Sequence, residues 1–235
     1  MLWYDLRSDK RRFFPGKVKY INDLGIQIEN AHIPFNNAND WMSEDRSARI
    51  RFVNDHKRYF EKLGSFGIDS VVMHVSRGEN IPEDFRSHVP VLRSLFEHAR
   101  TLKIKVCLEN TRSAPLLDYV LKNAGQDNVF LCYDSSHDFL YSKKKYSILL
   151  KHGRLVRCLH LSDNNGKMDN HYLPFEGKID WRVLTGNLRK IRFKGNISLE
   201  VVPSRNEKCT AEEFLAKAFA RAKTIYESMK DRKRT

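Results

Sequence analysis

The sequence has few cysteines and no long hydrophobic run. Its 235 residues include four cysteines, and no two of them form a CxxC pair. Cys107, Cys132 and Cys158 lie inside apolar runs, so we expect buried thiols in a reducing cytoplasm, without a cysteine metal site. No apolar run is long enough to span a bilayer, and the first residues lack the apolar core of a signal peptide. No membrane association is therefore expected.

The motifs that usually bind nucleotide phosphates are absent as well. The sequence contains neither GxGxxG nor GxxxxGK[ST], which removes the usual signals of an open, doubly wound nucleotide-binding sheet. Proline- or glycine-rich linkers and abrupt shifts in composition are also missing. We therefore expect a single α/β domain over residues 1–235.

Acidic residues are scarce relative to basic ones. The 29 Asp and Glu residues are outnumbered by 42 Lys and Arg residues, which gives a formal net charge of +13. Such a balance favours phosphorylated substrates, nucleic acid or another polyanion. Much of the excess lies in residues 9–19, 141–146 and 229–235, which we expect to be solvated helix and loop faces. The charge alone therefore assigns no partner.

Short apolar runs alternate with helical patterns along the whole chain. The apolar runs predict strands, and the spacing of apolar residues between them predicts helices. Pro90 marks either a kink or a helix start with the proline in the first turn. Thr210 and Glu213 form a capping box for the last helix. The predicted strands are 1–4, 26–31, 70–74, 105–108, 129–133, 156–161 and 197–201, and the predicted helices are 43–63, 82–102, 115–123, 146–151, 181–191 and 211–229.

Polar residues that can bind a metal stand at the end of nearly every predicted strand. In a barrel of parallel strands these ends open onto one face, where active sites are built. Burying a carboxylate costs several kcal/mol unless a cation or hydrogen bonds compensate. Glu109 and Glu200 each follow an apolar run without an adjacent basic residue, so a divalent metal is their simplest partner. The residues at strand ends are His32, His74, Glu109, Asp134, His160 and Glu200.

Several short motifs resemble one known superfamily. "AHIPF", "VMHVS", "LENT", "YDSSH", "HLSDNNGKMDNHYLPFEGKIDW" and "ISLEV" are similar to the signature of the xylose-isomerase-like TIM barrels. This superfamily holds sugar phosphate isomerases and epimerases, and AP endonucleases of the endonuclease IV type. The resemblance implies a (β/α)8 TIM barrel. By motif order the first β/α unit is missing, so we expect an N-terminally truncated chain in which Met1 is an internal methionine.

The resemblance also implies roles for individual residues. A divalent metal (Mn, Zn, Co or Mg) would be held by Glu109, Asp134, His160 and Glu200, and the two glutamates would act as the acid/base pair. His137 resembles a substrate-contacting histidine, and Arg112 is a candidate for binding a phosphate. The endonuclease IV branch binds more metal ions. The residues that match its additional ligand positions, or that could contact substrate instead, are His32, His74, His137, Asp169 and His171.

Two enzymatic functions follow from the resemblance. The first is a metal-dependent isomerase or epimerase that converts a sugar or sugar phosphate through an enediolate. The alternative is an endonuclease IV-like phosphodiesterase acting on abasic DNA. The short loops after the strands favour a small molecule over nucleic acid, whereas the additional ligand positions favour the phosphodiesterase. A barrel that only binds a ligand is disfavoured by the intact carboxylate set, and a homodimer is compatible with a missing first strand.

Overall fold

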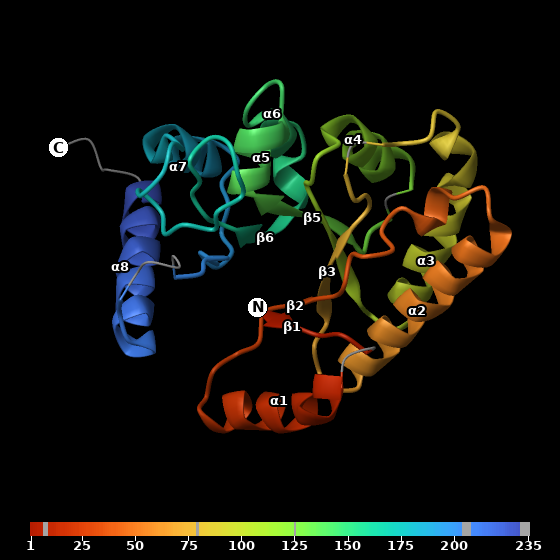
Figure 1. The fold of residues 1–235 in the computed structure, drawn as a ribbon, viewed down its shortest axis with the longest axis horizontal. Coiled ribbons are helices and arrows are strands. Elements are labelled where there is room, and N and C mark those ends of the chain that lie inside the picture. Colours follow the sequence, from red (N-terminus) through yellow and green to blue (C-terminus); the bar gives the residue numbers. More distant parts are fainter. Residues whose placement is uncertain (7–8, 79, 125, 204–207, 231–235) are drawn as a thin grey trace. The chain divides into compact units, whose positions relative to one another are not determined.

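The computed structural model describes residues 1–6, 9–78, 80–124, 126–203 and 208–230 (Figure 1). The chain divides into two compact units. The first unit comprises residues 1–109 and 115–130, and the second comprises residues 110–114 and 131–235. Strands and helices alternate along both units, as predicted. Residues 231–235 of the basic run at 229–235 lie outside the described residues, and the single domain over 1–235 stays a prediction.

The first unit contains four parallel strands in chain order. They are β1 (Leu2–Trp3), β2 (Ala31–His32), β3 (Ser70–His74) and β4 (Lys105–Glu109). The register sets His74 opposite Glu109 and His32 opposite Val72. Metal-capable side chains therefore share one end of this sheet.

The predicted strand at 26–31 is wrong except for its last residue. Ile26 is 55% exposed, and its backbone N–H donates to the carbonyl of Ile21 at the end of the preceding helix. Gly25 stands between them with a φ of 71°. This is the cap of a helix, in which a left-handed glycine is followed by an apolar residue. The apolar Ile26 therefore serves the helix end and not a strand.

The helices of the first unit follow the predicted pattern with one addition. Helix α1 was not predicted, because its apolar residues sit among the basic ones of the 9–19 run. Pro90 lies in the first turn of α3, which confirms the prediction of a helix start and not the prediction of a kink. Helices α2 and α3 pack side by side (Figure 1). The helices are α1 (Phe14–Asp23), α2 (Arg46–Gly64), α3 (Val89–Thr101) and α4 (Ala114–Asn123), with short 3-10 turns at Asp9–Phe13, Asp40–Met42 and Phe85–His88.

Strand β5 (Val129–Asp134), which lies in the second unit from Leu131 onward, runs parallel to β6 (Val156–His160). The predicted strand at 197–201 is reduced, in the described part of the chain, to one parallel bridge between Leu161 and Leu199. The capping box of Thr210 and Glu213 is confirmed, and α7 packs against α8. The helices are α5 (Ser135–Tyr141), α6 (Ser147–Lys151), α7 (Trp181–Lys190) and α8 (Ala211–Met229), with a 3-10 turn at Gly153–Leu155.

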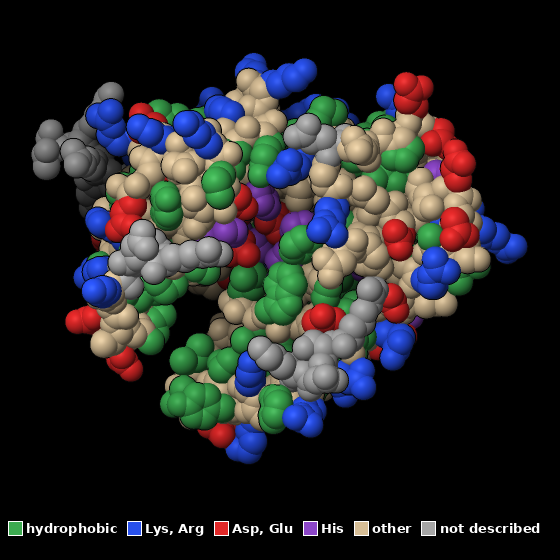
Figure 2. All heavy atoms as spheres, in the orientation of Figure 1, with side chains coloured by type: hydrophobic (Ala, Val, Ile, Leu, Met, Phe, Trp, Pro, Cys, Tyr) green, Lys and Arg blue, Asp and Glu red, His purple; other side chains and the backbone are tan. Residues whose placement is uncertain are grey.

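The cysteines that the structure buries and the lysines that it exposes are those that the sequence predicts. Cys107, Cys132 and Cys158 are buried free thiols, as predicted. The described lysine side chains of the basic runs at 9–19 and 141–146 are exposed. Lys and Arg side chains stand at many places on both units in the face shown in Figure 2. None of the helices in the described part of the chain combines the length and apolarity that crossing a membrane requires.

Candidate metal centre and active site

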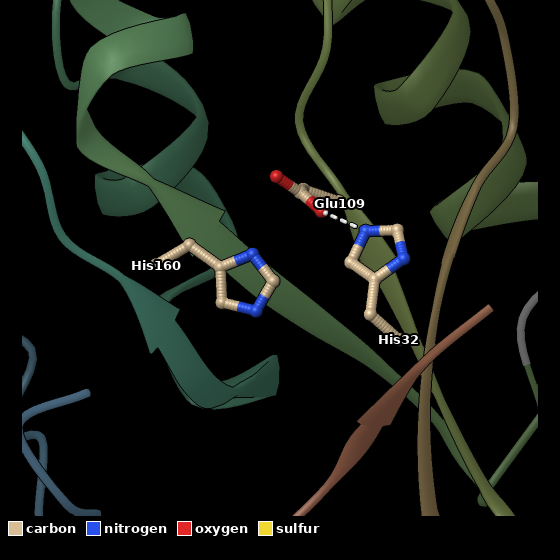
Figure 3. A group of neighbouring side chains, drawn as sticks. All are labelled: His32, Glu109 and His160. Atoms are coloured by element: carbon tan, nitrogen blue, oxygen red, sulfur yellow. Dashed lines mark hydrogen bonds and ion pairs between the residues drawn. The ribbon is translucent and has the colours of Figure 1, made fainter. Parts of the chain in front are cut away.

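A buried carboxylate in the first unit is contacted by two histidines. The Oε2 atom of Glu109 lies 3.1 Å from Nε2 of His32 and 3.1 Å from Nε2 of His74. Figure 3 shows the His32 ring, which comes from β2, pointing at this carboxylate at the end of β4. All three side chains are buried. Two imidazole groups therefore supply the polar partners that a buried carboxylate requires.

Aromatic rings hold both histidines in place. Trp3 stacks on His32 with ring centroids 4.7 Å apart, and Phe35 stacks on His74 at 4.3 Å. The Nδ1 atom of His32 lies 2.7 Å from the carbonyl oxygen of Ile33. Because that carbonyl can only accept, Nδ1 is the donor, and the ring turns Nε2 toward Glu109. The orientation of these rings is thus set by packing and by the backbone.

Three candidate ligands converge in the second unit. The register of β5 and β6 sets Asp134 opposite His160. Glu200 joins them because its backbone N–H donates to the carbonyl of Leu161, the residue that follows β6. One ligand atom from each of Asp134, His160 and Glu200 lies within 4.8 Å of the others. Asp134 and His160 are completely buried. Two carboxylates and an imidazole at this spacing are donors that fit a divalent metal.

A second cluster in the same unit surrounds Asp169. Its Oδ2 lies 3.1 Å from Nε2 of His137 and 3.3 Å from Nε2 of His171, and its Oδ1 accepts a hydrogen bond from Ser136 at 2.5 Å. Burial opposes the charge on Asp169, but the hydrogen bonds from the two histidines and Ser136 outweigh it. They hold the pKa of this carboxyl well below its usual range. The cluster is thus a carboxylate held between two imidazoles and a hydroxyl group.

His171 links this cluster to Glu200. Its backbone is left-handed, with a φ of 51°, and its Nδ1 donates to the carbonyl oxygen of Glu200 at 2.9 Å. The hydrogen bond to Asp169 is the largest cause that raises the pKa of His171, to about 9, while partial burial opposes the shift. A charged His171 therefore ties the loop that carries it to the segment that carries Glu200.

The loop that carries Asp169 and His171 is anchored by Asp163, a residue to which no role was assigned from the sequence. Asp163 is completely buried, and its Oδ2 accepts a hydrogen bond from Nε1 of Trp181 at 2.7 Å. Its carboxylate also accepts from the backbone N–H groups of Asn164, Phe175 and Ile179. An aspartate at the end of an apolar run was visible in the sequence, but its partners lie up to 18 residues away. Asp163 therefore fixes the conformation of this loop through its hydrogen bonds.

The two predicted substrate contacts, His137 and Arg112, lie in different surroundings. His137 lies in the Asp169 cluster, and its Nδ1 lies 3.0 Å from the carbonyl oxygen of Asn110, another residue that the sequence did not mark. Arg112 is exposed, and its guanidinium lies 4.6 Å from the centre of the Tyr141 ring. The roles of both residues toward substrate stay predictions.

Comparison with protein families gives a match over most of the chain. Residues 17–223 match the family described as "Xylose isomerase-like TIM barrel". This agrees with the motifs in the sequence and with the alternation of parallel strands and helices.

Two of the curated proteins with similar sequences illustrate the range of the match. The uncharacterized protein y4fM of Sinorhizobium fredii is 28% identical over 166 residues, which is 63% of this chain and only 52% of that protein. The inosose isomerase of Bacillus subtilis is 23% identical over 205 residues, which cover 80% of this chain and 72% of that enzyme. The chain thus spans about half the length of the first relative.

Solved structures with the same fold cover nearly the whole chain. The structure of IolI protein with a bound zinc atom has a TM-score of 0.80 and 18% identity, covering 97% of this chain and 89% of that chain. The D-allulose 3-epimerase of a Methylomonas species has a TM-score of 0.79 and 15% identity, covering 95% and 86%. These likenesses confirm the predicted TIM-barrel fold.

Proposed function

Because the chain belongs to the xylose isomerase-like TIM barrel family, we propose that it is a metal-dependent isomerase or epimerase of a sugar or sugar phosphate. The relatives named inosose isomerase and D-allulose 3-epimerase support the reaction class. The observation that carries the proposal is the convergence of Asp134, His160 and Glu200, whose ligand atoms lie within 4.8 Å of one another.

We assign Glu109 to the same metal on the basis of the fold. In TIM barrels the carboxyl ends of all strands open onto one face, and catalytic residues come from several different strands. Glu109 is the last residue of β4, and Asp134 and His160 are the last residues of β5 and β6. The proposed metal ligands are therefore Glu109, Asp134, His160 and Glu200.

The chemistry follows from the residues that would hold the ion. When bound, a divalent ion would polarise the substrate carbonyl and stabilise negative charge on its oxygen. One of the two glutamates, Glu109 or Glu200, removes the proton from the carbon next to the carbonyl. The other returns a proton to the neighbouring carbon or to the opposite face. An acid/base pair positioned in this way contributes about 10²–10⁴-fold to the rate.

His137 and Arg112 are the proposed substrate contacts. The ring of His137 is held between Asn110 and Asp169, so its position is fixed before a substrate arrives. Arg112 follows β4 and is exposed, which suits a residue that binds the hydroxyl or phosphate end of a sugar.

A second candidate function rests on the five additional residues of metal-ligand type. His32 and His74 contact Glu109, and His137 and His171 contact Asp169. A sugar isomerase that uses one metal ion does not require these groups as ligands. If they bind further zinc ions, the site has the composition of a phosphodiesterase acting on abasic DNA, in which metal ions generate the attacking hydroxide.

Metal content and activity separate the two functions. Protein purified without added metal is analysed for ions per chain and assayed on a panel of ketoses, inososes and their phosphates. About one ion per chain, lost in Glu200→Gln together with isomerisation, supports the isomerase. Two or three zinc ions, of which one is lost in Asp169→Asn, together with nicking of abasic DNA, support the phosphodiesterase. Folded protein that binds no metal would contradict both functions.

A matched variant controls for the loss of charge. Glu176 lies in the same loop as Asp169, but it is exposed, and Arg221 is 3.7 Å away. Glu176→Gln therefore removes a carboxylate without touching a proposed ligand. It should keep the metal content and the activity of the unmodified chain.

A further inference from the structure

Two adjoining pockets in the second unit are lined by basic side chains. The first, of about 890 Å³, lies between the segment that precedes β6 and the end of α7. The second, of about 600 Å³, lies between the segment after α7 and the end of α8. The described residues that line them include no Asp or Glu, and both pockets include Arg192. We call the residues Arg154, Arg189, Lys190, Arg192 and Lys194 the basic cluster.

Neighbouring carboxylates do not account for the basic cluster. Its five side chains are exposed, and none of them forms an ion pair with another residue in the described part of the chain. Arg189 and Lys190 stand in the last turn of α7, where a positive charge offsets the helix dipole. Arg154, Arg192 and Lys194 lie outside the α-helices, so the dipole does not explain them. A bound anionic ligand would explain why these cations gather at the pockets.

Arg192 occupies a backbone position that normally belongs to glycine. Its φ is 56°, its N–H donates to the carbonyl of Arg189, and the N–H of Phe193 donates to the carbonyl of Leu188. This pair of hydrogen bonds closes a Schellman motif, in which a left-handed glycine is usual. A side chain here costs free energy that glycine avoids. The arginine at the junction of the two pockets therefore calls for a role of its side chain.

Close packing shapes both pockets. A methyl group on Gly153 would lie 2.5 Å from the side chain of Ile191, and one on Gly195 would lie 2.5 Å from the ring of Phe193. Phe193 and Tyr226 add aromatic surface to the second pocket, and Tyr226 is 51% exposed. Lys230, which pairs with Glu227, lies 4.6 Å from the centre of the Tyr226 ring.

We propose that these pockets bind a nucleotide, with its phosphate on the basic cluster and its base against the aromatic surface. Grooves that bind single-stranded nucleic acid combine the same two features, a positive track for phosphates and aromatic rings for bases. The first pocket is lined in part by the segment that precedes β6, whereas the candidate metal ligand His160 is the last residue of that strand. This binding is therefore separate from the proposed sugar chemistry and does not depend on it.

Fluorescence anisotropy of the full chain with a labelled single-stranded oligonucleotide tests the proposal. Arg192→Gly removes one cation and relieves the left-handed backbone, so it should fold at least as stably as the unmodified chain. We expect it to weaken binding about tenfold, the effect of losing one charge-assisted contact. Phe193→Leu should weaken binding of the oligonucleotide but not of inorganic phosphate. Unchanged binding in Arg192→Gly, with thermal melting showing a folded protein, would overturn the proposal.

A matched control separates a site from general attraction between opposite charges. Arg182 lies on α7, its side chain is 96% exposed, and it lines neither pocket. Arg182→Gln should leave the affinity unchanged. An equal loss in both variants means non-specific electrostatic binding and overturns the site.

Competition by adenosine monophosphate identifies the form of the ligand. Displacement of the oligonucleotide by this mononucleotide, lost in Arg192→Gly, supports a mononucleotide site. Binding of the oligonucleotide alone, with the same sensitivity to Arg192→Gly, supports a single strand. Inorganic phosphate that competes as strongly as the mononucleotide would show that the aromatic surface plays no part, contrary to the proposal.

Discussion

The Nδ1 atom of His160 lies 3.0 Å from the Oε2 atom of Glu200. The two residues come from different segments, since His160 ends β6 and Glu200 follows the residue that bridges to Leu161. A buried imidazole and a carboxylate at this distance offer two of the donors that a divalent metal binds. Together with Asp134, this pair forms the part of the proposed metal centre that lies in the second unit.

Removal of metal should lower the thermal stability of the chain. A ligand that binds only the folded state stabilises it by about 4 kcal/mol when its free concentration is a thousand times its dissociation constant. We expect chelation to lower the melting temperature of the unmodified chain and of Glu176→Gln. Glu200→Gln should melt at the same temperature with and without chelator. A chelator effect of full size in Glu200→Gln would contradict the ligand assignment.

The stability of the metal-free chain should fall as the solution becomes alkaline. The hydrogen bond to Asp169 raises the pKa of His171 to about 9 in the folded protein, above its ordinary value of about 6.5. The folded state therefore binds this proton more tightly than the unfolded state. The resulting stabilisation is complete below about pH 6.5 and is lost as the pH rises through about 9. Urea unfolding at several pH values measures this slope.

Two variants test the cause of that slope. His171→Asn removes the titrating group, and Asp169→Asn removes the main cause of its raised pKa. Both should flatten the dependence of the unfolding free energy between pH 6.5 and 9. A slope that persists in both variants would assign it to another group.

The sequence marks much of the candidate site because the strands are buried on both faces. Strands β3 and β4 are continuous apolar runs, so a histidine or a carboxylate at their ends stands out. In this way the sequence indicates His74, Glu109, Asp134 and His160 as candidate ligands. Their partners were less visible, because contacts such as His32 with Glu109 join residues 77 positions apart.

Other features could not be predicted because one residue serves two purposes. The sequence predicts Asp134 as a ligand at the end of a strand, and its side chain also accepts the backbone N–H of His137 as the N-cap of α5. The helix that follows was therefore missed. Ile26 was assigned to a strand, although it closes the end of α1. In both cases the local pattern is compatible with two structures, and the tertiary contacts decide between them.

Replacing Asp163 should loosen the loop that carries Asp169 and His171. All the partners of Asp163 are N–H donors, so an amide in its place turns an NH₂ group toward at least one of them. We expect Asp163→Asn to cost about 1.5–3 kcal/mol of unfolding free energy, measured by urea titration. Asp180→Asn is the control, because this residue is an exposed N-cap of α7, where asparagine serves as well as aspartate. Equal losses in the two variants would contradict a special role for Asp163.

Two glycine substitutions in the second unit should change stability in opposite directions. A methyl group on Gly177 would overlap the carbonyl oxygen of Asn164 and the carboxylate of Asp163, so Gly177→Ala must displace the loop anchor. We expect it to cost about 1–3 kcal/mol. Gly186 lies inside α7, and a methyl group there would meet nothing within 4 Å. Gly186→Ala should therefore stabilise the chain by about 0.5–1 kcal/mol, since alanine loses less backbone entropy in a helix. Urea unfolding of both variants measures the difference, and a neutral Gly177→Ala would show that the loop adjusts without the contacts of Asp163.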